Sequence, residues 1–120
     1  QTVKDNLTGL EWSRCLAGME RAKNKCINEA QSMTHEAASS LCSEKNGFRL
    51  PNIRELESLI NYCDHTPAVF VSVFGDTKQG NVWSSTKSSA DESVIWQVSF
   101  DYGMIKAMPA NQKAHVRCVK

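Results

Sequence analysis

The sequence predicts an α+β fold of 120 residues, because helical and strand patterns occupy separate stretches of the chain. Capped helical patterns fill residues 33–63, and alternating β-formers fill most of 81–119. Five isolated cysteines, with no Cys-x-x-Cys pair among them, indicate disulfides and an oxidising compartment. The alternative is a set of buried free thiols in a cytosolic protein. Since five is an odd number, at least one cysteine is left over or bonded to another chain.

The composition predicts one domain, residues 1–120, with a genuine core, since 41% of residues are apolar and 22% are charged. A net charge of +1 predicts no general attraction to nucleic acid or to a membrane, and no apolar run is long enough to span a bilayer. The sequence opens at Gln1 without an initiator methionine and reads as a mature or excised fragment. The lack of a signal peptide therefore does not argue against secretion.

The first 26 residues predict a turn, short strands and a loop. The stretch 5–10 has turn formers and a glycine at Gly9 that can take a positive φ. Val3, Leu10 and Trp12 are expected at strand positions around it. Residues 15–26 are polar and basic and predict a loop, which a bond between Cys15 and Cys26 would close.

Two helices are predicted next. Thr34 is placed to cap a first helix that ends at Asn46-Gly47. An extended segment, 48–51, follows, because the residue before Pro51 avoids the helical region. Asn52 and Glu55 then form a capping-box pattern at the start of a second helix. Its apolar stripe is Ile53, Leu56, Leu59 and Ile60, and it is expected to end near Tyr62-Cys63.

The remainder predicts an antiparallel meander. Strands are expected over 69–74, 81–86, 94–100, 104–108 and 115–119, with loops over 87–92 and 109–113 and a turn at 101–103. For 69–74 the alternative is a segment that is partly a loop with short turns.

Four blocks of sequence occur in a characteristic order: Asp5-Asn6-Leu7-Thr8-Gly9-Leu10-Glu11-Trp12, Phe48-Arg49-Leu50-Pro51-Asn52-Ile53-Arg54-Glu55-Leu56, Val82-Trp83-Ser84-Ser85-Thr86 and Val116-Arg117-Cys118-Val119. With these blocks the chain resembles, over nearly its whole length, the bacterial family typified by the C-terminal domain of the Legionella collagen-like protein, an extracellular adhesin. The second and third blocks together are specific, although each alone is weak.

The resemblance implies a C-type-lectin-like fold, a twisted antiparallel sheet with two helices and neighbouring termini, related also to the formylglycine-generating enzyme group. It implies a secreted or cell-surface location and binding of sulfated glycosaminoglycans. It further implies a bond between the first helix and the last strand, which here is Cys42–Cys118. Cys15 and Cys26 then pair locally, and Cys63 is left free.

The sequence does not favour an enzyme. His35, His65 and His115 lie on a helix start, a loop and a late strand, and no Gly-x-Ser-x-Gly or His-Glu-x-x-His motif is present. Cys63 stands next to Asp64-His65, but adjacent residues rarely face each other well enough for proton transfer, so a solvated loop is the better interpretation.

No metal or other cofactor is predicted. The Glu-Pro-Asn, Gln-Pro-Asp and Trp-Asn-Asp signatures of calcium-dependent lectins are absent, and Trp83-Ser84-Ser85 stands where the last of these would lie. Hydroxyls are weak calcium ligands beside carboxylates. The pair Asp91-Glu92 is interpreted as an exposed acidic loop.

Basic residues form two clusters that are distant in the sequence. One comprises Arg14, Arg21, Lys23 and Lys25, and the other comprises Lys106, Lys113, Arg117 and Lys120. If the fold brings the termini together, the clusters could merge into one face for a sulfated polymer, since sulfate favours arginine forks and lysine charges. The alternative is that these lysines only keep the surface soluble. We predict a binding surface of Arg14, Arg21, Lys23, Lys25, Lys106, Lys113 and Lys120.

The family blocks themselves are predicted to be structural. Asn52 is expected to cap the second helix, Leu50 and Trp83 to enter the core, and the serines of 84–85 to satisfy backbone groups in a turn. Trp12, Trp83 and Trp96 are all expected in the core, and stacking of a sugar on an exposed indole is the alternative.

Two functions from different classes remain. The leading one is an extracellular adhesin domain that binds sulfated or other anionic glycans. The other is an assembly module of a surface appendage, such as a pilus-type subunit, that binds protein. A collagen-like parent would imply a homotrimer, although no Gly-X-Y repeat occurs in this chain.

Overall fold

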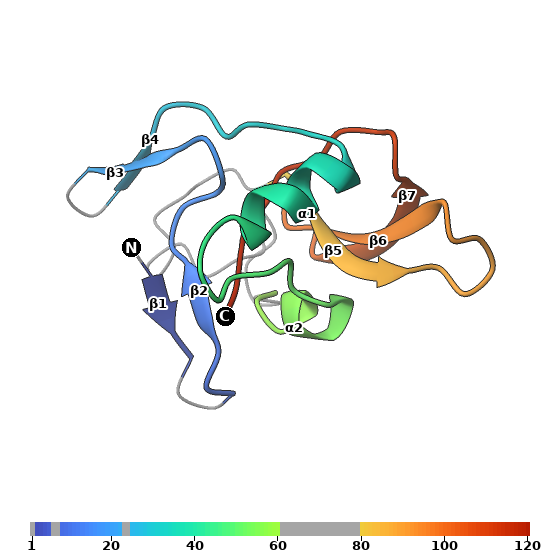
Figure 1. Cartoon of the computed structure of the whole chain (residues 1–120), viewed down its shortest axis with the longest axis horizontal. Helices are drawn as coiled ribbons and strands as arrows, with labels where there is room; N and C mark the ends of the chain where they lie inside the picture. Colours follow the sequence, from blue (N-terminus) through green and yellow to red (C-terminus); the bar gives the residue numbers. More distant parts are fainter. Residues whose placement is uncertain (1, 6–7, 23–24, 61–79) are drawn as a thin grey trace.

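The computed structural model describes residues 2–5, 8–22, 25–60 and 80–120 and has the predicted α+β organisation (Figure 1). The elements are β1 (Thr2–Lys4), β2 (Glu11–Ser13), β3 (Glu20–Ala22), β4 (Lys25–Ile27), α1 (His35–Ser43), α2 (Ile53–Glu57), β5 (Asn81–Lys87), β6 (Val94–Ser99) and β7 (Met104–Pro109). The named strands form three antiparallel sheets, β1-β2, β3-β4 and β5-β6-β7. The strand predicted at 69–74, the helix end at Tyr62-Cys63, and His65 lie outside the described residues.

The two ends of the chain meet at β2. On one side β1 pairs with β2, with Val3 opposite Trp12, and Gly9 takes a φ of 79° in the turn between them. On the other side the C-terminal segment lies against β2, since Glu11 N donates to Lys120 O at 2.7 Å and Lys120 N donates to Glu11 O at 2.8 Å. Because neighbouring strands lie about 5 Å apart, the two termini are separated by only one strand at this point. The neighbouring termini that the resemblance implied are therefore present.

The three-stranded sheet carries one helix on each face (Figure 1). Leu56 of α2 packs with Val82 and Val98, which point to one face of the sheet. Cys42 of α1 packs with Trp83, which points to the other face because side chains alternate along a strand. The buried apolar residues therefore form two clusters, one on each face of the sheet.

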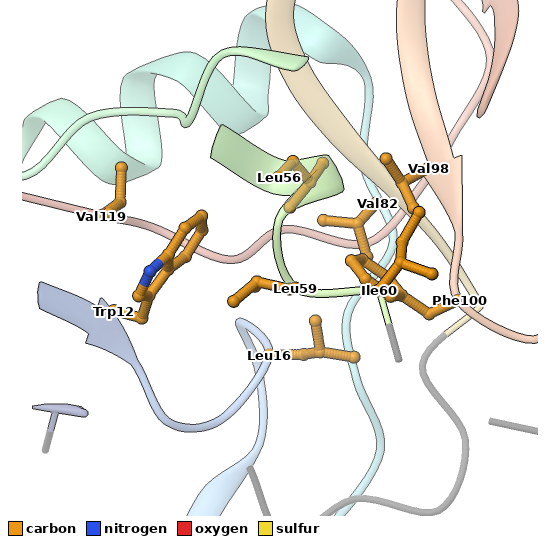
Figure 2. Packing of buried hydrophobic residues seen from close by; sticks show 9 residues of the cluster. All are labelled: Trp12, Leu16, Leu56, Leu59, Ile60, Val82, Val98, Phe100 and Val119. Atoms are coloured by element: carbon orange, nitrogen blue, oxygen red, sulfur yellow. The ribbon is translucent and has the colours of Figure 1, made fainter. Parts of the chain in front are cut away.

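The larger cluster joins the sheet to the N-terminal region. Figure 2 shows its nine buried residues, Trp12, Leu16, Leu56, Leu59, Ile60, Val82, Val98, Phe100 and Val119. Trp12 from β2 and Phe100 from the end of β6 are each about 1% exposed or less. Burying side chains of this size contributes roughly 1.5–3 kcal/mol each. The cluster therefore holds β2, α2 and the sheet together.

Both implied disulfides are present. Cys15–Cys26 spans 11 residues, and Cys42–Cys118 spans 76 residues and ties α1 to the C-terminal segment. Cys63 lies outside the described residues, so its free thiol stays a prediction.

Three sequence predictions about the elements were wrong. Residues 15–26 are not only a loop, because they contain the β3–β4 hairpin, in which Arg21 is paired with Cys26. The segment 115–119 is not a continuous strand: it makes single bridges to Val82, Trp12 and Arg49 in turn, so no ladder with one partner forms. Ser84 and Ser85 lie within β5 rather than in a turn.

Both helices end earlier than predicted. α1 ends at Ser43, whose hydroxyl donates to Ser40 O at 3.1 Å, and Gly47 takes its φ of 83° only in the turn beyond. α2 ends at Glu57, and the chain then tightens into turns in which Leu59 N donates to Leu56 O and Ile60 N donates to Glu57 O.

Candidate functional site

The two most specific sequence blocks, 49–56 and 82–86, are bonded to each other. Ser85 N donates to Pro51 O at 2.8 Å, and Ile53 N donates to the Thr86 hydroxyl at 2.9 Å. Asn52 caps α2 in a full capping box, with Glu55 N donating to Asn52 Oδ1 at 2.8 Å and Asn52 N donating to Glu55 Oε1 at 2.9 Å. These bonds confirm that Asn52 caps α2, and they hold the two blocks together.

An ion pair completes this junction. Both terminal nitrogens of Arg49 donate to the Glu55 carboxylate, at 2.7 and 2.8 Å. The bond to Arg49 holds the pKa of Glu55 below its ordinary value, and the same bond raises the pKa of Arg49. A bidentate fork of this kind fixes the direction of α2 relative to the preceding segment. Leu50 and Trp83 are buried beside it, as predicted.

A cleft of about 490 Å³ opens between the N-terminal strands and the end of α1. Its lining comprises Thr2, Ser13, Arg14, Cys15, Leu16, Ala17, Gly18, Met19, Gln31, Leu41, Lys45 and Phe48. We call it the basic cleft because Arg14 and Lys45 line it. Lys120 does not line the cleft, but its ammonium lies 5.1 Å from the centre of the ring of Phe48, which does. The cleft and its edge therefore bring together one cation from each predicted cluster.

Lys45 is the cation that sequence reasoning missed. It follows α1 in the turn that leads to Phe48, where Phe48 N donates to Lys45 O at 3.0 Å. Nothing in the local sequence separates it from an ordinary surface lysine. One carboxylate approaches the same region, because Glu11 accepts a bond from the hydroxyl of Thr2 at 3.0 Å.

Arg117 belongs to the second basic cluster of the sequence but not to the predicted binding surface, and it is buried, with 1% of its surface exposed. Its guanidinium donates to the carbonyl oxygens of Ser13, at 2.6 Å, and of Arg14. It therefore holds the end of β2, and with it the backbone of Arg14, against the C-terminal segment. Its role is structural support for the wall of the basic cleft.

The β3–β4 hairpin extends from the basic cleft. Arg21 and Lys25 lie on its two strands, and the Cys15–Cys26 bond fastens it to the cleft lining. Lys23 lies outside the described residues.

Lys106 and Lys113 are not brought to this cleft. Lys106 is exposed on β7, which lies at the opposite end of the long axis from the hairpin (Figure 1). Ala114 forms a bridge with Met33, so Lys113, which precedes Ala114, lies near the start of α1. Lys45 follows the other end of that helix. Nine helical residues separate these ends by about 13 Å. The predicted surface is therefore not one continuous basic face.

A second hollow, of about 580 Å³, lies where α2 meets the sheet. We call it the Trp96 hollow, and its lining comprises Asn52, Ile53, Arg54, Thr86, Lys87, Ser89, Trp96 and Ile105. Trp12 and Trp83 are buried as predicted, but Trp96 is only half-buried. The prediction for Trp96 was wrong because α2 is five residues long and leaves that end of the sheet face uncovered.

His35 is the histidine whose surroundings the structure defines most fully. His35 packs edge-on against Trp83, with ring centres 5.4 Å apart, and burial lowers its pKa. Within the ranges that the structure describes, no three His, Cys, Asp or Glu side chains gather as a metal site. No helix in those ranges has the length and apolar character needed to cross a membrane.

The fold and the clefts define a disulfide-linked α+β domain with a cationic cleft at its joined termini. The chain belongs to the Lcl C-terminal domain family, whose model matches residues 1–120. No curated protein matches the sequence significantly. The family points to a surface-associated domain, and the two disulfides fit an extracellular location.

Proposed function

We propose that this domain is a non-enzymatic adhesin module, secreted or at the bacterial cell surface, that binds sulfated glycosaminoglycans in the basic cleft. The observation that carries the proposal is that Arg14 and Lys45 line one cleft and Lys120 lies over the ring of Phe48 in the same lining, from three distant parts of the chain. A polyanion needs several charges in one field, because a single surface cation contributes little.

The hairpin supplies a route for a longer polymer. The β3–β4 hairpin, whose strands include Arg21 and Lys25, is fastened to the cleft lining by the Cys15–Cys26 bond. The proposed site therefore keeps Arg14, Arg21, Lys23, Lys25 and Lys120 of the predicted surface and adds Lys45. A C-type-lectin-like relationship is part of the proposal, and the bond from α1 to the C-terminal segment supports it.

The test is elution from heparin in a salt gradient. The variant Lys45→Glu/Lys120→Glu should elute at clearly lower salt than the parent, whereas the matched control Lys106→Glu/Lys113→Glu should elute close to the parent. Binding through exposed cations should also weaken steeply as salt rises, since the screening length falls to about 3 Å at 1 M. Equal elution of the two double variants would refute the assignment to the cleft.

An assembly module is the second candidate, and one observation favours it. Tyr102, in the turn before the edge strand β7, is 76% exposed, and Met104, the first residue of β7, is 55% exposed. Exposed apolar side chains at a sheet edge suit contact with another protein. Self-association that persists in high salt and is lost in Tyr102→Ser/Met104→Ser would support this candidate over the adhesin.

A further inference from the structure

We propose that the Trp96 hollow is a second saccharide site, which binds the pyranose ring of an acidic sugar against the indole of Trp96. The inference goes beyond the proposed function, because the hollow and the basic cleft share no lining residue. Its volume, about 580 Å³, lies within the range of roughly 300–1,000 Å³ usual for small-ligand sites.

The aromatic surface in the hollow is a consequence of the short helix. Trp96 and Val98 point to the same face of β6, and α2 covers Val98 through Leu56. The first helical residue, Ile53, lies at the edge of the hollow, and the sheet continues beyond it to Trp96. Ile53 and Ile105 line the hollow together with the indole and add aliphatic surface to it. The C–H face of a pyranose ring can stack on such a surface.

The rim of the hollow favours an anionic substituent. Arg54 and Lys87 both line it, and no aspartate or glutamate does. The Arg54 side chain is 85% exposed and touches Glu57 at 3.3 Å, an ion pair too exposed to hold it firmly. A carboxylate or sulfate on the ring would lie between these two cations while the ring contacts the indole.

The remaining polar groups suit a sugar better than a peptide. Ser89 is exposed at the rim, and the Thr86 hydroxyl accepts a bond from Ile53 N but keeps its own hydrogen for a ligand oxygen. Lysine is depleted at protein interfaces, whereas this hollow has Lys87 in the same lining as its one aromatic ring. An acidic saccharide satisfies both features together.

The first test uses the unmodified chain and a heparin hexasaccharide at low salt. Trp12 and Trp83 are 1% and 0% exposed, so acrylamide should quench Trp96 preferentially. We expect the hexasaccharide to protect this fluorescence from acrylamide, and the neutral chitohexaose to leave it unprotected. Absence of protection by heparin, or equal protection by both oligosaccharides, would overturn the proposal.

The second test separates this site from the basic cleft. In the Lys45→Glu/Lys120→Glu background, hexasaccharide affinity is measured calorimetrically for Trp96→Phe, Trp96→Ala and Arg54→Gln/Lys87→Gln. Loss of the indole or of both rim cations should weaken binding by about tenfold, whereas Phe should retain most of it. The control is Tyr102→Ala, which removes an exposed aromatic at the β6–β7 turn. If Trp96→Ala and Tyr102→Ala bind the hexasaccharide with equal affinity, or if the Lys45→Glu/Lys120→Glu background does not bind it at all, the second site is refuted. Neither result affects the assignment of the first site to the basic cleft.

Discussion

The two disulfides should contribute unequally to stability, because they close loops of very different length. Cys42–Cys118 spans 76 residues and Cys15–Cys26 spans 11. In the chain-entropy model, losing the first should cost about 4.5 kcal/mol and losing the second about 3 kcal/mol. Cys42 and Cys118 are also buried, at 0% and 2% exposure, so their replacement loses packing as well. Since domains are stable by about 5–15 kcal/mol, the longer bond decides whether the fold is retained.

Urea unfolding, followed by far-UV circular dichroism, measures this difference. Cys15→Ala/Cys26→Ala should unfold cooperatively at a reduced midpoint, whereas Cys42→Ala/Cys118→Ala should be marginal or unfolded at 37 °C. The sheet and both helices should be lost together in the second variant, because that bond joins α1 to the C-terminal segment. If the two double variants lose the same free energy of unfolding, or if both unfold at the urea midpoint of the parent, the entropic reasoning is wrong.

Three further predictions concern the capping box, His35 and Cys63. Asn52→Ala should lower the free energy of unfolding by about 1 kcal/mol and leave the heparin-induced amide shifts of the basic cleft unchanged; loss of those shifts in the folded variant would contradict a structural role. Burial lowers the folded pKa of His35 below its ordinary 6.5, so the unfolded chain binds more protons and stability should fall as pH drops below about 6.5. His35→Gln should flatten this part of the stability curve, and an unchanged slope would show that other groups cause it. Non-reducing peptide mapping after alkylation should find one labelled cysteine, Cys63; its recovery in an intramolecular bond would overturn the pairing.

Local signals predicted much of the scaffold. Thr34 and Asn52 cap their helices where the capping patterns placed them, and the three strands of the β5–β7 sheet begin within a residue of their predicted starts. The sequence did not reveal the β3–β4 hairpin, because its apolar alternation is too short to stand out from a basic loop. The resemblance, rather than spacing alone, selected the disulfide pairing, since any four cysteines allow three connectivities.

The candidate sites were less predictable because they depend on tertiary placement. Arg117 sits in a cationic stretch, yet two carbonyl oxygens from the end of β2 draw it inside. Lys45 looks like any surface lysine until the C-terminal segment brings Lys120 to Phe48. The alternating pattern of β6 predicts that Trp96 is buried, and only the shortness of α2 leaves it at a hollow. Such long-range contacts leave no signature in the neighbouring sequence.

A titration of the ¹⁵N-labelled domain with heparin hexasaccharide, followed by amide chemical shifts at low salt, tests the central claim most directly. The basic cleft predicts that the amides of its lining, from Ser13 to Met19 and around Lys45 and Phe48, shift together and saturate. The shifts of these cleft amides should disappear in Lys45→Glu/Lys120→Glu. Shifts confined to β7 and the turn before it, or no saturable shift in the cleft, would contradict the account.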